Sequence, residues 1–383
     1  MTKIIYAKRL DKFPEYVFSK LAKVVKEIEL SSKRKVLNFG PGTPDVRPSQ
    51  VYLNKLKDFI DESNSHLYPG YGATPYFEKS LIQYYKNRFG VALSKEELLP
   101  LLGAKDGVSH IALALCNPGD EVLLPDPGYP GYVGPTLMVG GRPVYYNANP
   151  DLSPKDIFLQ LAKKITKKTK YIWVNFPSNP TGQVANLDDL KVIVKIAKKH
   201  NVFIIYDNAY SEITFDKFVA PSILQVKGGG DVAIEMGSFS KSLSFAGFRV
   251  GYVVGNKGII AALAKIKSQI DSGLSLPIQK LVAFALDNPN KKWQKEMIQS
   301  YKSRRDIIAK KLKKLGLKFD VPKGSLYIWA KIPDSEKNSE EFSMRILKEK
   351  QILLTPGSAF GKNGQRFVRV SICVNIDKID EYF

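Results

Sequence analysis

Short apolar runs alternate with amphipathic segments along most of this chain. The runs are rich in Val, Ile and aromatic residues, and the segments between them carry apolar residues at helical spacing. Apolar runs of this kind, separated by helices, are typical of strands that are buried on both faces. The pattern therefore predicts a mostly parallel α/β sheet. The predicted strands are Glu121–Pro125, Pro143–Tyr146, Tyr171–Asn175, Val202–Asp207, Val232–Met236 and Arg249–Val254.

Helices are predicted before and between these strands. One of them begins at Pro75, and Thr74 before it is a suitable N-cap residue, because its hydroxyl can accept from the first free amides. The predicted helices are Phe13–Glu29, Val51–Glu62, Pro75–Arg88, Asp156–Ile165, Leu187–His200 and Lys257–Ile270, together with an apolar helix that runs through Cys116.

The pattern changes after Pro277. Two long helices are followed by strands with a single helix between them, which predicts a separate α+β domain. The boundary is expected between residues 275 and 295. The predicted elements are the helices Ile278–Leu286 and Trp293–Leu315, the strand Ser325–Ile332, the helix Ser339–Lys350, and the strands Ile352–Thr355 and Phe367–Ile372.

Composition places the chain among globular proteins. It has 383 residues, of which 44% are hydrophobic and 25% charged, so it can bury a large core and form more than one domain. No apolar run is long enough to span a bilayer, and residues 1–10 contain no apolar stretch typical of a secretory signal. Cys116 and Cys373 stand in apolar surroundings and are expected to be buried thiols in a reducing compartment. We therefore expect a cytoplasmic protein without a membrane partner.

The net charge of +21 raises the possibility of a nucleic-acid partner. The lysines, however, are spread along amphipathic stretches such as Leu187–His200 and Lys291–Lys318, and no zinc-finger spacing or RNA-binding signature occurs. A lysine-rich solvated surface explains the charge better, so no nucleic acid is expected. His66, His110 and His200 show no spacing or carboxylate partner that indicates a metal site or a triad, and no metal is expected.

The stretch from Met236 to Tyr252 differs from the other lysine-containing segments. Lys241 follows a buried strand and is surrounded by small and hydroxyl residues. A lysine at such a place can be desolvated, which favours the neutral, nucleophilic amine. A neutral amine beside hydroxyls and an arginine suits a Schiff base with an aldehyde whose phosphate the arginine holds. From this stretch alone, an ordinary loop lysine is an equally good interpretation.

The same stretch resembles the lysine region of class I/II aminotransferases that depend on pyridoxal 5'-phosphate (PLP), with the pattern Ser-x-Ser-Lys-x-x-x-x-x-Gly-x-Arg. Ser238, Ser240, Lys241, Gly247 and Arg249 fill every fixed position. The resemblance implies that Lys241 forms the Schiff base with PLP. It also implies that the two serines and Arg249 bind the phosphate.

Two further motifs resemble the same family. Asn175-Phe-Pro-Ser-Asn-Pro-Thr-Gly182 follows a predicted strand, and the resemblance implies that Asn179 binds the cofactor's ring oxygen and the substrate carboxylate. Asp207 ends another apolar run, where a buried carboxylate is costly unless it is paired. A helix N-cap is one explanation, and a pyridinium nitrogen is the other. The spacing Asp-x-x-Tyr resembles the family, in which Tyr210 would bind the ring oxygen.

The turn Gly103-Ala-Lys-Asp-Gly107 precedes a helix, where free amides suit a phosphate. Most such turns are only helix starts, but the resemblance implies a phosphate cradle that uses the amides of Ala104 and Lys105. Tyr129 is an aromatic loop residue by itself, and the resemblance implies a ring that stacks on the pyridine of PLP.

Arg369 lies within the apolar strand Phe367–Ile372, where alternation alone also allows it to face outward. Arginine is rarely buried unpaired, and its planar fork suits a carboxylate. The resemblance assigns Arg369 to the substrate α-carboxylate and places the backbone of Gly42 near that group. It also implies that Tyr68 reaches across a homodimer interface to the partner's cofactor phosphate, although Ala73, Phe77 and Glu78 depart from the family's usual residues beside this loop.

The resemblance extends from Gly42 to Arg369 and implies a fold type I PLP-transferase, with a large mostly parallel α/β domain and a smaller α+β domain. We divide the chain into an N-terminal arm that belongs to the small domain (1–45), a large PLP-binding domain (46–285) and a small C-terminal domain (286–383). The implied reaction is ping-pong transamination, with small-molecule partners. An L-amino acid of aspartate, LL-diaminopimelate or aromatic type would give its amino group to a 2-oxo acid such as 2-oxoglutarate. Alternatives are a carbon–sulfur β-lyase or decarboxylating enzyme of the same fold and, remotely, an aminotransferase-like nucleic-acid-binding regulator.

Overall fold

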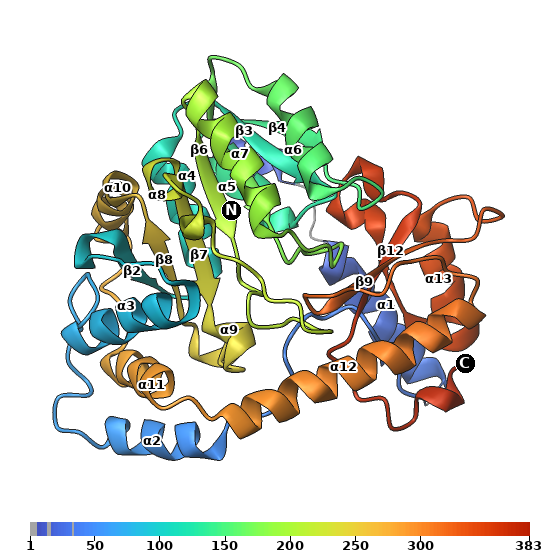
Figure 1. Ribbon diagram of the computed structural model, residues 1–383. Coiled ribbons are helices and arrows are strands. Elements are labelled where there is room, and N and C mark those ends of the chain that lie inside the picture. The colour runs from blue at the N-terminus through green and yellow to red at the C-terminus, as the bar shows by residue number, and fades with distance from the viewer. Residues whose placement is uncertain (1–5, 14–16, 33) are drawn as a thin grey trace, which may run out of the picture.

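A seven-stranded sheet forms the centre of the protein in this computed structural model, which describes residues 6–13, 17–32 and 34–383 (Figure 1). The strand order is β2-β8-β7-β6-β5-β3-β4, and all neighbours from β7 to β4 are parallel. Only β8 runs in the opposite direction, and it pairs antiparallel with both β7 and β2. The predicted, mostly parallel sheet is therefore confirmed. Its strands are β2 (Leu98–Leu101), β3 (Glu121–Asp126), β4 (Arg142–Asn147), β5 (Thr169–Asn175), β6 (Phe203–Asp207), β7 (Ala233–Ser238) and β8 (Gly251–Gly255).

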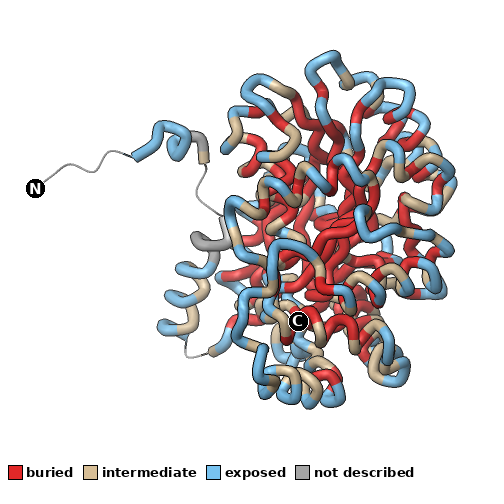
Figure 2. The backbone as a smooth tube through the Cα atoms, turned by 90° about the vertical axis from the view of Figure 1, so that its left-hand side faces the viewer, coloured by how far each residue is buried: buried red, intermediate tan, exposed pale blue. Residues whose placement is uncertain are grey.

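The alternation of side chains along the strands builds a core on each face of the sheet. On β5, Ile172 and Val174 pack with α6 (Pro154–Leu161) and α7 (Leu187–His200). Tyr171 and Trp173, one position out of phase, pack with α4 (Ala104–Leu115) and α10 (Lys257–Lys267) on the other face. Buried residues accordingly fill the interior of the body in Figure 2.

Further helices complete the large unit. The short helix α5 (Val133–Met138) follows β3, and α2 (Gln50–Ile60), α3 (Pro75–Phe89) and α11 (Leu276–Asp287) pack against the β2–β8 edge of the sheet. Thr74 occupies the N-cap position of α3, but its side chain does not cap the helix, which corrects that prediction. Its hydroxyl donates instead to Gln279 at 2.9 Å and thereby ties α3 to α11.

The long helix α12 (Lys291–Lys314) leads to the C-terminal unit, as Figure 1 shows. There a three-stranded sheet has the order β11-β12-β9, and a separate parallel pair joins β1 to β10. The pairing of β1 with β10 attaches residues 37–38 to this unit, while the domain division, with the N-terminal arm as part of the small domain, stays a prediction. The elements are α1 (Val17–Ser32), β1 (Leu37–Asn38), β9 (Tyr327–Lys331), α13 (Ser339–Lys350), β10 (Ile352–Leu353), β11 (Thr355–Pro356) and β12 (Phe367–Ser371).

Two other predictions need comment. The single strand expected over Ile352–Thr355 is wrong, because β10 and β11 belong to different sheets and the chain changes partner at Leu354. Strand β2 was not predicted, since Pro100 interrupts its apolar run; the strand tolerates proline because it lies at the sheet edge. The helix predicted over 13–29, and the N-terminal stretch considered for a secretory signal, lie partly outside the described residues.

Cys116 and Cys373 are both buried and free, as expected. Within the described ranges, none of the helices has the length and apolar character needed to cross a membrane.

Candidate active site

A cavity of about 620 Å³ opens where the carboxyl ends of the central strands meet the C-terminal unit. Ligands of open α/β sheets bind beyond these strand ends. All the predicted site residues except Tyr68 line the cavity: Gly42, Ala104, Lys105, Tyr129, Asn179, Asp207, Tyr210, Ser238, Ser240, Lys241, Arg249 and Arg369. The fold thus brings together residues from the N-terminal segment, the large unit and the C-terminal unit.

Lys241 lies on α9 (Phe239–Ser242), a one-turn helix that follows β7 directly. Its Nζ donates to the carbonyl oxygen of Gly42 at 2.9 Å and lies 5.7 Å from the centre of the Tyr210 ring. The side chain is only partly buried, and its amine points into the cavity lining. Lys241 therefore contacts the N-terminal segment at Gly42 while its own backbone lies at the carboxyl end of β7.

Asp207 ends β6 and is buried at the base of the cavity. Burial raises the pKa of its carboxyl, while hydrogen bonds from the Tyr132 hydroxyl (2.6 Å) and the Ala209 amide (3.2 Å) act in the opposite direction. A buried carboxylate with these donors is suited to pair with a cationic group of a ligand. Tyr132 is itself held by stacking on Trp173, with ring centroids 4.3 Å apart.

Arg369 faces the cavity, so the outward orientation that strand alternation also allowed is wrong. Only 4% of the residue is exposed, because β12 is the central strand of its sheet. Its guanidinium donates to Asn179 Oδ1 at 3.1 Å and to the Gly40 carbonyl at 2.6 Å. The rings of Tyr327 and Phe360 lie 4.3 and 4.6 Å from its Cζ. Cation–π contacts and two hydrogen bonds therefore fix the orientation of the Arg369 guanidinium.

The turn before α4 forms the other end of the cavity. Gly103 has φ +81°, a backbone conformation that favours glycine, and a Cβ there would displace the guanidinium of Arg249 from its present position. Helix α4 begins at the next residue and is twelve residues long, so its first amides and its dipole favour an anion. Ser238 and Ser240 stand opposite on the β7–α9 connection. This donor set of amides, hydroxyls and a guanidinium fits a phosphate group.

Sequence reasoning missed several residues of the cavity. Tyr327 packs against Gly42, and its hydroxyl lies 3.1 Å from that of Tyr210. Phe360 and Asn175 also line the cavity, and Asn175 Nδ2 donates to the Asp207 carbonyl at 2.8 Å. Asn175 stood in the quoted motif and could have been found there. Tyr327 carried no local signal, because it comes from an ordinary apolar strand.

Two predicted residues stand apart from this arrangement. Tyr68 is 87% exposed and does not line the cavity of this single chain. The prediction that His110 has no carboxylate partner is wrong: its Nδ1 lies 2.9 Å from Asp106 Oδ1, one helical turn earlier on α4. The spacing of four residues within a helix was a signal for this pair.

Comparison with known proteins identifies the family of the chain. The family model of aminotransferase class I and II matches residues 34–382. The chain belongs to this family. The LL-diaminopimelate aminotransferase of Gloeobacter violaceus is 36% identical over 382 residues, which are 98% of this chain and 96% of its relative. That of Halothermothrix orenii is 35% identical with the same coverage. These similarities make the chain a transaminase of a PLP-dependent family.

Solved structures show the same fold. Substrate-bound BacF from Bacillus subtilis superposes with a TM-score of 0.90 at 31% identity, covering 99% of this aminotransferase and 96% of BacF. The N-succinyldiaminopimelate aminotransferase from Mycobacterium tuberculosis gives a TM-score of 0.89 at 26% identity, covering 99% and 98%. The expected fold type I architecture is therefore confirmed.

Proposed function

We propose that this aminotransferase binds PLP in the cavity and transfers the amino group of an L-amino acid to a 2-oxo acid by a ping-pong reaction. The observation that carries the proposal is the convergence of Lys241, Asp207 and Arg369 on one cavity. An amine, a buried carboxylate and a carboxylate-binding fork are what such a reaction requires. When bound, PLP supplies an aldehyde for a Schiff base and an electron sink for the carbanion at Cα.

The residues of the cavity fit the parts of PLP. The amides of Ala104 and Lys105, together with Ser238, Ser240 and Arg249, would bind the phosphate. Asp207 would pair with the pyridine nitrogen, and the Tyr132 hydroxyl bonded to Asp207 helps to keep that carboxylate charged. Tyr129 would pack on the ring, while Asn179 and Tyr210 would bind the ring oxygen. Lys241 Nζ would hold the aldehyde carbon.

Arg369 would bind the α-carboxylate of the substrate, helped by Asn179 and the backbone at Gly42. Its guanidinium is oriented in advance by Asn179, Gly40 and the two flanking rings, so little conformational entropy is lost on binding. With the carboxylate fixed there, the Cα–H bond of the substrate can be held toward Lys241. Lys241 Nζ, freed when the amine of the substrate takes its place on the aldehyde carbon, would then take the proton from Cα as general base and return a proton as general acid.

LL-diaminopimelate is the amino donor that we propose to test first, with 2-oxoglutarate as the acceptor. Support comes from the similarity over almost the full chain to proteins named LL-diaminopimelate aminotransferase. Aspartate and aromatic amino acids remain in the panel, because no residue of the cavity identifies the group that binds the substrate side chain.

The first test is a half-reaction without an acceptor. The protein is loaded with PLP, freed of excess cofactor and mixed with LL-diaminopimelate, meso-diaminopimelate, aspartate, glutamate or tyrosine in turn. We expect the visible absorbance of bound PLP to be replaced by that of pyridoxamine phosphate, fastest with LL-diaminopimelate, and to return when 2-oxoglutarate is added. A protein that binds no PLP would contradict the proposal. Pyruvate and ammonia formed from a cysteine conjugate without any oxo acid would identify a β-lyase instead.

We further propose a homodimer in which Tyr68 completes the partner's phosphate site. Tyr68 is highly exposed, and Leu67 and Tyr71 beside it are also more than half exposed, so this loop offers an apolar contact surface.

The test of this shared site uses two inactive variants. Tyr68→Ala and Lys241→Ala are unfolded together and refolded as a mixture. If Tyr68 acts across the interface, mixed dimers contain one site with both native residues, and we expect activity well above that of either variant refolded alone. If Tyr68 acts within its own chain, mixing restores nothing. A monomer in analytical ultracentrifugation would also contradict the proposal.

A further inference from the structure

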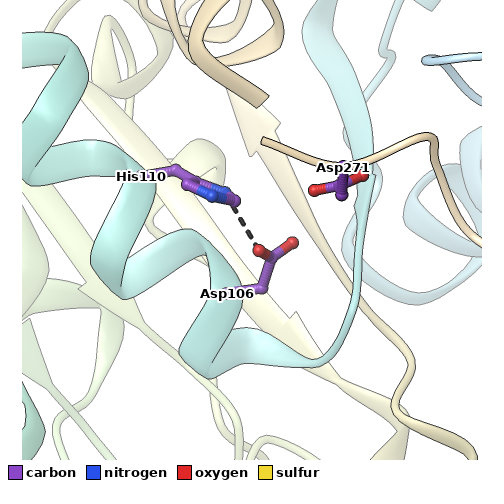
Figure 3. A group of neighbouring side chains, drawn as sticks. All are labelled: Asp106, His110 and Asp271. Carbon is purple, nitrogen blue, oxygen red and sulfur yellow. Dashed lines mark ion pairs between the residues drawn. The ribbon is translucent and has the colours of Figure 1, made fainter. Parts of the chain in front are cut away.

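An ionic cluster lies on α4, the last turn of α10 and the segment that follows α10, outside the cavity. Asp106, His110 and Asp271 each place a ligand-type atom within 4.8 Å of the others, and Figure 3 shows His110 and Asp106 on adjacent turns of α4 directed toward Asp271. This composition suits a metal ion, but Lys267 occupies the position of the cation. Its Nζ donates to Asp106 Oδ2 at 2.9 Å and to Asp271 Oδ2 at 2.6 Å.

Lys267 is unusual among the lysines of this chain because only 1% of it is exposed. Removing an ammonium from water is costly unless its charge is paired. Here two carboxylates pair it, and His110 supports Asp106 from the other side. Burial tends to raise the pKa of Asp106, but hydrogen bonds from His110, Lys267 and the Leu102 amide lower it to about 2. The Asp106 carboxyl is therefore ionised near neutral pH.

The cluster is bonded directly to the turn at the end of the cavity. The Leu102 amide donates to Asp106 Oδ2 at 3.0 Å, on the same oxygen that accepts from Lys267. This bond helps to fix the turn that leads directly to Ala104 and Lys105, which line the cavity. An Asp106 side chain in another position would leave the Leu102 amide without this bond, and the turn would then rely on backbone bonds such as that from the Gly103 amide to the Leu101 carbonyl (2.7 Å).

The other carboxylate reaches the Tyr68 loop. Asp271 Oδ1 accepts from the Gly273 amide at 2.8 Å. Gly273 lies so close to the carbonyl of Gly70 that a Cβ there would overlap it, and Pro69 is also in contact range. One ammonium thus ties together the turn before α4 and the segment against which the loop of Tyr68 rests. Of the described residues that line the cavity, none belongs to the cluster.

We propose that Lys267, with Asp106, Asp271 and His110, is a positioning device for the cofactor phosphate. It holds the amides of Ala104 and Lys105 in the geometry that binds the phosphate and supports the Tyr68 loop from behind. This inference rests on the proposed binding of PLP. It assigns these four residues a role in affinity for the phosphate group rather than in catalysis.

The test compares PLP with pyridoxal, which lacks the phosphate. In Lys267→Met, the dissociation constant of PLP is expected to rise about 10- to 100-fold, the effect of losing a charge-assisted hydrogen bond. The dissociation constant of pyridoxal is expected to change less than about twofold, because the ring contacts do not involve the turn. Both constants are measured by absorbance titration of the apoprotein. Lys265→Met is the matched control, since Lys265 is exposed on the same helix and its loss should change neither constant.

Circular dichroism establishes that each variant is folded. If Lys267→Met does not fold, Asp271→Asn provides a milder comparison, because it removes one of the two carboxylate charges that hold Lys267 Nζ; we then expect a smaller rise in the dissociation constant of PLP and still no change for pyridoxal. Equal weakening of PLP and pyridoxal, or unchanged binding of both, would overturn the inference and leave the cluster a purely structural ion pair. If the unmodified protein binds neither ligand, the proposed function itself fails, and this inference fails with it.

Discussion

Replacing Lys241 by alanine is expected to lower the rate of transamination by at least about 10³-fold, since a positioned general base alone contributes roughly 10²–10⁴-fold. The variant also loses the covalent attachment of the cofactor. Absorbance of the protein loaded with PLP should therefore no longer show the band of the lysine adduct, while the phosphate contacts still retain some PLP. Single-turnover measurements with the best amino acid of the panel give the rate.

Lys191→Ala is the control for the first prediction. Lys191 lies exposed on α7, pairs with Asp188 at the surface and does not line the cavity, so its loss removes the same charge outside the site. We expect this variant to match the unmodified protein in rate and absorbance. A Lys241→Ala protein that keeps more than about a tenth of the activity would exclude this lysine as the base.

Replacing Arg369 by methionine is expected to lower kcat/KM for amino acids and 2-oxo acids by about 10²–10⁴-fold. The estimate follows from two charge-assisted hydrogen bonds to the α-carboxylate, each worth roughly 1.5–3 kcal/mol. Methionine retains much of the side-chain volume between Tyr327 and Phe360, so the loss reflects the guanidinium. Affinity for PLP should change little, because Arg369 lies on the substrate side of the proposed site.

The role of Arg369 can be separated from general damage with an amine that lacks the α-carboxylate. Its slow reaction should be unaffected by Arg369→Met. Arg345→Met is the matched control: Arg345 is exposed on α13 of the same unit and pairs with Glu336 and Glu349. Equal losses for the amine and the amino acid would show that Arg369 supports the structure and does not bind the carboxylate.

The strands were predictable because each shows a local pattern. All six predicted strands of the large sheet occur, with ends that differ by a few residues. Helices Leu187–His200 and Ser339–Lys350 have the predicted bounds, since Asn186 and Asn338 cap them and an αL residue ends each. Strand β2 and the break between β10 and β11 were missed, because the partner of an edge or very short strand lies far away in the chain.

The residues of the candidate site also fall into those that a sequence motif located and those that only the structure revealed. Residues carried by motifs, such as Lys241, Asn179 and Asp207, were located from the sequence and do line one cavity. Tyr132 and Tyr327 were not located from the sequence. Tyr132 bonds to Asp207, 75 residues away, and Tyr327 bonds to Tyr210, 117 residues away, so no local pattern connects them. The functional roles of all these residues stay predictions until the variants above are measured.

By itself, the sequence of this protein determined the order of strands and helices, the family motifs and the identity of the reactive groups. These features depend on side-chain periodicity and on spacings within short segments. Only the tertiary structure decided that Arg369 faces inward, that Thr74 bonds to Gln279, and that Lys267 is buried between Asp106 and Asp271. Such outcomes depend on which distant groups share a dry environment, where an unpaired charge or donor is costly. That pairing exists only once the chain has folded.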